Sequence, residues 1–462
     1  MQHGKSSRKK ARLATATAGL QATRIVFGRF ALARSLRMTV LVSLGIQVAN
    51  LASGVVLARA LGPVDRGELA IAMLWPILIV GLGIMGISDA VVYLVGRDGD
   101  QSAEVLSSAL LVGMIQSVIL LGVGWLIVPY VLAGKPADVV NVSLFYLWSI
   151  PLALLAGYPL ALLQGRLLLA PFNLARASVH IFYTAVLLVM WLAHGVTIRS
   201  AVVASLVASC LTLLLTFWLV VTRVPLRPRL SLGVIRLLLT YGAKLHIGNV
   251  ATLIVQRADL LALTLLAPAA VLGNYVVASA IGMGAGLIPT AASIVLFPAF
   301  SNRQESDYPR SVARFLMVAS GFTVVAGPVL TLLLPWTLPI LFGPAYAPAV
   351  PTAMILVLAY LVRGWNQMLF SILRGTGHPL SASTAEAGGL VVMTILLAFL
   401  VPRYAGSGAA VSVLVGACAT LTWVVLRTLT ASRLTAQLMI TYWSSDLANL
   451  IRLVRVPSAT ES

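Results

Sequence analysis

The chain has 462 residues, of which 60% are hydrophobic and 10% charged, and its mean hydropathy is +0.99. Because soluble domains carry about 25% charged residues, this composition excludes an ordinary soluble protein and predicts one that crosses a bilayer many times. The net charge of +19 could suit a nucleic-acid-binding protein, but Lys and Arg fall mainly in short segments between apolar runs, so nucleic acid is not expected as a partner.

The first 37 residues hold nine Lys or Arg and no acidic residue. No cleavable signal peptide is expected, because the small residues Ala31–Ala33 precede the first apolar run, whereas a cleavage site would follow it. The composition overlaps with that of organellar transit peptides. We interpret residues 1–37 instead as a disordered basic cytoplasmic tail at an anionic membrane surface.

Apolar runs long enough to cross a bilayer, which requires roughly 20 residues, follow the tail. The chain is therefore expected to be an all-α integral membrane protein with a six-helix half at 38–222, a cytoplasmic linker at 223–240, a second six-helix half at 241–430 and an interfacial helix and tail at 431–462. The twelve expected spans are 38–60, 69–95, 105–132, 141–163, 174–194, 200–222, 243–266, 271–299, 312–334, 349–372, 383–401 and 407–430.

The positions of the basic residues predict the orientation. With the N-terminus inside, the cytoplasmic segments hold 24 of the 32 Lys and Arg, the opposite loops hold 5, and the remaining 3 lie within spans. Because cytoplasmic loops are enriched in Lys and Arg, both termini are predicted to be cytoplasmic. The expected location is the plasma membrane of a bacterium, which the protein crosses many times.

The two halves repeat one another in sequence. Three landmarks recur in the same order at nearly one spacing, and they suggest two halves of the same orientation, which is typical of transporters whose substrate site lies between the repeats. The pairs are Leu61–Pro63 with Leu266–Pro268 at an offset of 205, Leu163–Gly165 with Leu373–Gly375 at 210, and Ala201–Val202 with Ala410–Val411 at 209.

Span seven carries an unusual number of polar and charged residues. Asn249, Thr252, Gln256 and Asp259 are spaced along one helix face, and span one repeats this stripe with Ser43, Gln47 and Asn50. Small polar residues alone can be interhelical contacts. A charge in hydrocarbon, however, costs several kcal/mol unless it faces protein or water, so the charges of span seven predict the wall of a polar cavity.

Two cations are expected deep in the membrane, Arg257 in span seven and Arg363 in span ten. Arg257 lies 13 residues beyond Lys244, about 20 Å further into the bilayer at 1.5 Å per residue. Arg257 and Asp259 are two residues apart on different helix faces, so they are not expected to pair. Asp89 and Glu386, near the ends of spans two and eleven, are either helix-end carboxylates or ion-coupling groups.

No catalytic or cofactor site is predicted. The sequence has no metalloprotease or paired-cysteine motif, and its longest loops, about twenty residues, are too short for a nucleotide-binding fold. Cys210 and Cys418 both fall in apolar spans, so neither a disulfide nor a metal site is expected. The chain is therefore not expected to be an enzyme.

Several stretches resemble the polysaccharide flippases of the multidrug/oligosaccharidyl-lipid/polysaccharide exporter superfamily, whose fold is MATE-like. The resemblance covers about residues 36–430. It is carried by residues 57–70 (LARALGPVDRGELA), Arg257–Asp259 with Ala267–Pro268 and Gly273–Tyr275, Leu341–Gly343 and Leu373–Gly377. The fold that it implies has two pseudo-symmetric six-helix halves.

The resemblance implies a flippase that carries a polyprenyl-pyrophosphate-linked oligosaccharide from the cytoplasmic to the outer leaflet, with the bilayer and polysaccharide assembly proteins as further partners. In the family, cations of the central cavity engage the pyrophosphate or an acidic glycan. By position, Arg59, Arg257 and Arg363 take that role here, with Lys244 at the inner mouth, and Asp259 orients an arginine or couples an ion.

Three alternatives remain open. An ion-coupled drug or metabolite antiporter of the same fold would favour an acidic cavity, whereas the deep charges here are mostly basic. A lipid II flippase of the same superfamily usually has fourteen spans, against the twelve expected here. A membrane-embedded glycosyltransferase usually needs a large loop outside the bilayer, and the sequence has none.

Overall fold

The computed structural model describes residues 3–225, 229–286, 289–290, 293, 308–431, 437–438 and 440–442. Within these residues the chain is helical throughout and has no strand. The first half comprises α1 (His3–Gly83), α2 (Ile87–Arg97), α3 (Ser102–Val131), α4 (Ala137–Tyr146), α5 (Ser149–Gly165), α6 (Leu169–Leu192) and α7 (Ile198–Val221). The second half comprises α8 (Leu232–Leu266), α9 (Ala269–Ala285), α11 (Tyr308–Phe342), α12 (Val350–Gly375) and α13 (Pro379–Ala431).

Nine helices of the described residues are long and apolar enough to cross a membrane. Two of these are long enough for two spans each, Met38–Gly83 with 46 residues and Leu380–Thr430 with 51, and non-helical backbone at Gly62 and Ala405 divides them. The all-α membrane fold is thus confirmed. The count of twelve spans stays a prediction, because the expected span at 271–299 runs beyond the described part of α9. The expected interfacial helix and tail at 431–462 also stay a prediction, because most of these residues lie outside the described residues.

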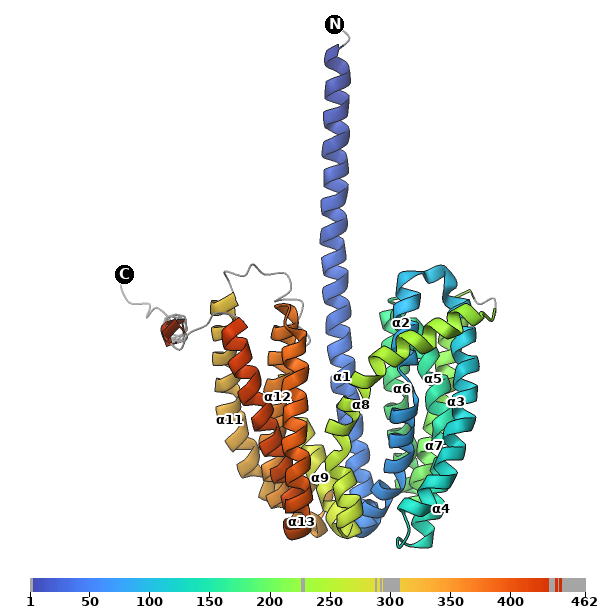
Figure 1. The fold of residues 1–462 in the computed structure, drawn as a ribbon, viewed down its shortest axis with the longest axis vertical. Coiled ribbons are helices and arrows are strands. Elements are labelled where there is room, and N and C mark those ends of the chain that lie inside the picture. Colours follow the sequence, from blue (N-terminus) through green and yellow to red (C-terminus); the bar gives the residue numbers. More distant parts are fainter. Residues whose placement is uncertain are drawn as a thin grey trace, which may run out of the picture.

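The N-terminal segment differs from the expectation of disorder. Helix α1 begins at His3 and continues without a break into the first span, as the long vertical helix of Figure 1 shows. Residues 3–37 are rich in Ala, Leu, Arg and Lys, which are good helix formers. Because they extend an existing helix, no new nucleus is required, and helix propensity alone can carry the segment.

The repeat is visible in the backbone as well as in the sequence. Residues with positive φ recur at the same places in both halves, in the turns after spans three, four and five and after their counterparts nine, ten and eleven. Such conformations are uncommon, so their repetition at a nearly constant offset indicates two copies of one fold. The pairs are Gly134 with Gly343, Leu167 with Gly377, and His194 with Ala405, at offsets of 209, 210 and 211.

The turn between α5 and α6 shares three backbone hydrogen bonds with the turn between α12 and α13. Three backbone N–H groups in each turn close the preceding helix, and every donor and acceptor of the second turn is offset by 210 from the first. In the first turn the donors are Arg166, Leu167 and Leu168 to the carbonyls of Leu162, Gln164 and Leu163; in the second they are Thr376, Gly377 and His378 to Ile372, Arg374 and Leu373.

The two halves meet at one end of the molecule and diverge at the other. Figure 1 shows α2 to α7 on one side and α11 to α13 on the other, spread apart toward the side where the N-terminus lies. We call this the open end, and it is the side predicted to be cytoplasmic. At the closed end α1 and α9 touch through Gly67 and Gly273. A Cβ at Gly67 would overlap the Ala269 carbonyl, and one at Gly273 would overlap the Pro63 carbonyl, a reciprocal contact typical of a two-fold axis.

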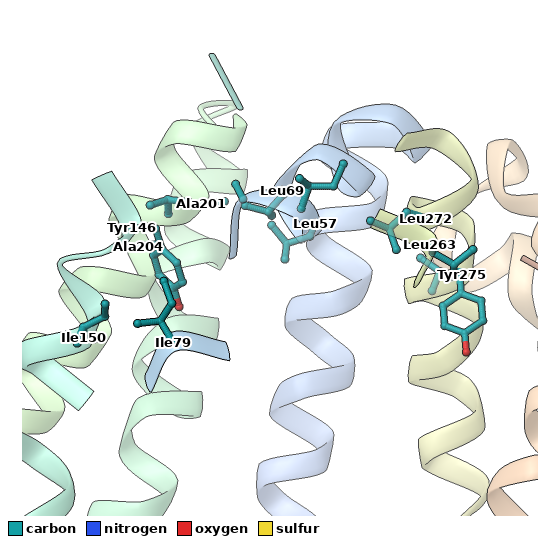
Figure 2. Close-up of a cluster of buried hydrophobic side chains, with 14 of the residues drawn as sticks. Leu57, Leu69, Ile79, Tyr146, Ile150, Ala201, Ala204, Leu263, Leu272 and Tyr275 are labelled. Atoms are coloured by element: carbon teal, nitrogen blue, oxygen red, sulfur yellow. The ribbon is translucent and has the colours of Figure 1, made fainter. Parts of the chain in front are cut away.

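The largest hydrophobic core crosses the closed end from one half to the other. Leu57 and Leu69 of α1 lie between Tyr146 and Ala201 of the first half and Leu263 of the second (Figure 2). A second cluster, which includes Val312, Phe370 and Val424, belongs to α11, α12 and α13 alone. Burial therefore joins the halves at one end and leaves each half to its own core at the other.

Helix α8 belongs to both halves. Figure 1 shows it starting over the group formed by α2 to α7 and ending beside α9 and α13. Its first part, residues 232–249, packs on α2 and α3, and we call it the inner arm. Its last part packs on α13 and α9, within the second half. The sequence had placed the whole span in the wall of the second half.

Candidate functional site

A cavity of about 630 Å³ lies in the second half. Helices α8, α9, α12 and α13 supply its walls, and Gln47 of α1 is the first half's contribution. Five ionisable side chains with formal charge line it, namely Arg257, Asp259, Arg363, Arg374 and Glu386. The structure thus brings four of the seven predicted site residues together with one that was not predicted.

Arg257 and Arg363 come from different helices and converge on one turn of α8. The Arg363 Nη2 donates to the Val255 carbonyl at 3.3 Å, two residues before Arg257. The Arg363 guanidinium also lies 5.5 Å from the centre of the Tyr360 ring, close enough for a cation–π contact. The Arg257 Nε is buried and has no hydrogen-bond partner among the described residues. The deep part of the cavity therefore carries two guanidinium groups with unused donors.

Asp259 does not neutralise Arg257. Its carboxylate is 5% exposed and accepts hydrogen bonds from the Tyr275 hydroxyl at 2.6 Å and from the Leu260 backbone N–H at 2.8 Å. Among the described residues no ion pair links it to Arg257, as the different helix faces predicted. Tyr275 is fully buried in α9 (Figure 2), so the carboxylate joins α8 to α9. Two neutral hydrogen-bond donors, rather than a cation, therefore stabilise the negative charge of Asp259.

Arg374 was not among the predicted site residues, because in sequence it falls within an expected cytoplasmic segment. The structure places it in the last turn of α12, along the cavity wall, with its guanidinium 6.0 Å from the centre of the Phe370 ring. Helical spacing could have found it, because Arg374 follows Arg363 by eleven residues, about three turns, and so lies on the same face. Arg374 and the half-buried Glu386 occupy the part of the cavity nearer the open end.

Neutral polar groups complete the lining and were also missed. Asn366 is 4% exposed, and its amide donates to the Ala417 carbonyl at 3.0 Å while its Oδ1 has no partner among the described residues. Gln367 is exposed beside it, and Gln47 and Gln256 face the same space. The signal was present, since Trp365–Gln367 interrupts an apolar run with two amides.

Arg59, Lys244 and Asp89, the other three predicted site residues, lie away from this cavity. Arg59 lies at the closed end and donates from Nε to the Leu341 carbonyl at 2.8 Å and from Nη2 to the Ile340 carbonyl. It thereby caps the C-terminus of α11 across the contact between the halves. Lys244 is exposed on the inner arm, and the Asp89 carboxylate accepts from the Asn249 amide at 2.7 Å.

The wall of the first half carries its own polar contacts. The Arg176 Nη2 of α6 donates to the Ser43 hydroxyl of α1 at 2.8 Å, and the His180 ring lies 2.8 Å from the Asn50 amide oxygen. Two residues of the polar stripe of span one, Ser43 and Asn50, thus contact the neighbouring span five, whereas Gln47 lines the cavity. In the second half the corresponding stripe faces the cavity instead, through Thr252, Gln256 and Asp259.

A comparison with known protein families assigns the chain to one of them. Residues 32–304, more than half of the sequence, match the family described as polysaccharide biosynthesis protein. The chain belongs to the polysaccharide biosynthesis protein family. Among curated proteins none matches it. The resemblance to a polysaccharide family that the sequence motifs predicted is thereby confirmed.

Solved structures share the fold of this family member. An inward-facing multidrug resistance MATE family transporter of the MOP superfamily aligns with a TM-score of 0.67 and 16% identity, over 86% of this chain and 100% of that one. The lipid II flippase MurJ in an inward closed conformation aligns with a TM-score of 0.72 and 14% identity, over 92% and 94%. The eukaryotic MATE transporter AtDTX14 aligns at 0.57 and 14%, over 88% and 99%. At these identities the likeness establishes the MATE-like fold alone.

Proposed function

We propose that this family member moves a polyprenyl-pyrophosphate-linked oligosaccharide from the cytoplasmic to the outer leaflet of the bacterial plasma membrane. The observation that carries the proposal is the cationic cavity, whose lining holds three arginines, Arg257, Arg363 and Arg374, and only two carboxylates. One of these, Asp259, is already satisfied by Tyr275. The cavity therefore favours an anion, and guanidinium groups suit phosphate oxygens because their planar fork can bind two at once.

The physical barrier to flipping explains why a cationic cavity is needed. A pyrophosphate and a hydrophilic glycan cannot cross hydrocarbon unaided, because unpaired charged and polar groups are costly to bury. Two halves that rock against each other would hold the head group in the cavity and leave the lipid tail in the bilayer. The three arginines follow the wall from the open end inward, so the anion would meet Arg374 first and Arg257 last.

The neutral lining suits a glycan attached to that anion. Asn366, Gln367 and Gln256 offer amide donors and acceptors, and Tyr360 and Phe370 offer aromatic faces. Sugars carry hydroxyl groups that need hydrogen-bond partners when they leave water. Lipid II is one pyrophosphate-linked cargo of this chemistry, and it remains the alternative within the proposal. Polysaccharide assembly proteins are the expected partners after release.

An ion-coupled antiporter for cationic drugs is the weaker candidate. Such a cargo would meet three arginines in the cavity against two carboxylates, and one of these, Asp259, already accepts hydrogen bonds from Tyr275 and Leu260. Cation efflux from vesicles would decide against our proposal. We retain Asp89 and Glu386 as candidates for ion coupling, which the proposed flippase also permits.

Binding to the purified protein tests the proposal. Arg363→Ala should weaken binding of a polyprenyl pyrophosphate oligosaccharide about 10- to 100-fold, because charged hydrogen bonds contribute about 1.5–3 kcal/mol each. Arg403→Ala is the matched control, since Arg403 is exposed on α13 and does not line the cavity. Equal binding by Arg363→Ala and the wild type would reject the assignment of the cavity.

A further inference from the structure

Glu386 has a structural counterpart of opposite charge in the first half. It is the ninth residue after the positive-φ turn at Gly377, and Arg176 is the ninth residue after the equivalent turn at Leu167. The offset is 210, the same as for the matching hydrogen bonds of the two turns. Arg176 and Glu386 therefore occupy equivalent positions on spans five and eleven, at the same depth in their halves.

The contacts of Arg176 show how a charged side chain at this position of span five binds the neighbouring span one. The guanidinium donates to the Ser43 hydroxyl at 2.8 Å and to the Thr39 carbonyl at 3.4 Å. Spans one and seven correspond at an offset of 205, as Leu61–Pro63 and Leu266–Pro268 show. At this offset the counterparts of Thr39 and Ser43 in the second half are Lys244 and Gly248, one residue from the offset of 206 that relates Gly67 to Gly273. A carboxylate on span eleven would face an ammonium group on span seven.

In the structure the inner arm of α8 does not take up this position. It packs instead on the first half, where the Tyr241 ring stacks on Tyr93 with centroids 4.3 Å apart. The His246 Nε2 lies 2.9 Å from the Leu82 carbonyl, and the Asn249 amide donates to Asp89 at 2.7 Å. Lys244 is left exposed, and Glu386 has no ion pair among the described residues.

We propose that the inner arm of α8 exchanges between the two halves and that an ion pair between Lys244 and Glu386 holds it in its second position. There α8 would pack on α13 as α1 packs on α6 in the first half. The arm would then cover the cavity at the open end, which the present position leaves accessible. This regulation of access rests on the proposed transport function, but it does not depend on which lipid-linked glycan is carried.

The present contacts of the arm are of a kind that can be exchanged. They include a ring stack and hydrogen bonds at its exposed side, the close approach of Gly242 to Gly86, and the burial of Leu238 in the larger hydrophobic core. Packing on α13 would have to replace the apolar contact of Leu238. Neither Lys244 nor Glu386 would have to leave an existing ion pair to form the new one. Glu386 also lies in the field of Arg374 and Arg363, so an anion bound to these arginines would leave the carboxylate free for Lys244.

Cysteine cross-linking tests the exchange without any substrate. In a background with Cys210→Ala and Cys418→Ala, the pair Lys244→Cys with Glu386→Cys should form a disulfide in membranes. The matched control is Lys244→Cys with Ala387→Cys, because Ala387 is exposed but points about 100° away around the helix. We expect at least tenfold more cross-linking in the first pair. Equal cross-linking in both pairs would overturn the proposal.

A charge exchange tests the ion pair. Lys244→Glu and Glu386→Lys should each reduce export of the glycan at least tenfold, and the double variant should recover most of it. Failure of the double variant to exceed either single variant, at equal expression and equal thermal unfolding, would also overturn the proposal. This outcome can be separated from that of the proposed function. A protein that forms the cross-link but does not bind a pyrophosphate lipid would support the exchange of the inner arm and reject the proposed cargo.

Discussion

At the residue scale, the cavity owes its character to charges that the protein itself leaves unneutralised. Arg257 has a buried Nε without a partner among the described residues, although Asp259 is only two positions away. The carboxylate is held instead by the Tyr275 hydroxyl and the Leu260 N–H. Tyr275 therefore acts as a positioning residue, which holds the Asp259 carboxylate of α8 against α9.

Removal of the Tyr275 hydroxyl should affect both stability and binding. In Tyr275→Phe the buried carboxylate loses one of its two hydrogen bonds, and the expected cost is about 1–3 kcal/mol of unfolding free energy. The carboxylate, which lines the cavity, would also be a less well compensated negative charge there and would weaken binding of a pyrophosphate lipid several-fold. Tyr404→Phe is the control, because Tyr404 is 64% exposed. Unchanged melting temperature and affinity in Tyr275→Phe would show that the hydrogen bond has no such role.

The sequence and the structure assign different roles to Arg59. The sequence predicts a substrate contact, whereas the structure shows a cap on the last carbonyls of α11. If the structural role is correct, Arg59→Ala leaves the affinity for a pyrophosphate lipid within about twofold, because the site is at the closed end, while the loss of charged hydrogen bonds destabilises the contact between the halves by about 1.5–3 kcal/mol. A tenfold loss of affinity with no loss of stability would restore the sequence prediction.

The sequence could identify deep charges but not their surroundings. Arg257 and Arg363 stand out because a cation within an apolar run is rare and costly. Arg374 did not stand out, since it falls at the end of a run, where a basic residue is ordinary. Arg59 occupies a similar end, yet it binds carbonyls that lie about 280 residues away in sequence. Distant contacts of this kind leave no trace in local composition.

At the element scale, α1 and α9 form the contact that closes one end of the molecule. Gly67 and Gly273 allow the two backbones to approach so closely that a Cβ on either would overlap a carbonyl of the other helix. Small residues are the usual means of close helix approach in membranes. If the halves separate at this end during transport, the contact must open, so added volume here should disfavour the present state.

Gly273→Ala should therefore destabilise the closed end. The new methyl group would overlap the Pro63 backbone carbonyl, and overpacking of this kind costs about 1–3 kcal/mol. Gly284→Ala on the same helix is the control, because its Cβ would have no atom within 4 Å and alanine is the better helix former. Thermal unfolding of the two variants measures the difference. Equal melting temperatures would mean that α1 and α9 do not touch in the protein.

The elements themselves were largely predictable, and their partners were not. The expected spans that fall wholly on described residues are helical, because about 20 apolar residues in a bilayer can satisfy their backbone only in that way, but turns at 84–86 and 147–148 divide the expected spans 69–95 and 141–163 into two helices each. The inner arm of α8 shows the limit. Its residues predict a helix, but nothing in their pattern says whether that helix packs on α2 or on α13, and both surfaces are apolar.

At the scale of the whole molecule, the two halves diverge toward the side of the N-terminus (Figure 1), and the predicted orientation makes that side cytoplasmic. The exposed Gln367 in the cavity should then be reachable from the cytoplasm. In a background without Cys210 and Cys418, Gln367→Cys should react with a membrane-impermeant thiol reagent added to the cytoplasmic side, and a pyrophosphate lipid should protect it.

Val118→Cys is the control for this accessibility. Val118 is 72% exposed on α3 within an apolar helix, so it should face lipid and react poorly with a polar reagent from either side. Faster reaction of Gln367→Cys from the outer side than from the cytoplasm would contradict the predicted orientation or the closure at Gly67 and Gly273.

Transfer of the cargo between leaflets tests the central claim most directly. The purified protein would be placed in vesicles that hold a fluorescent polyprenyl pyrophosphate oligosaccharide in one leaflet, and arrival in the other leaflet would be followed with an impermeant quencher. We predict transfer by the wild type, transfer at least tenfold slower with Arg363→Ala, and transfer at the wild-type rate with Arg403→Ala. A wild-type rate equal to that of protein-free vesicles, or equal rates for the wild type and Arg363→Ala, would contradict the account.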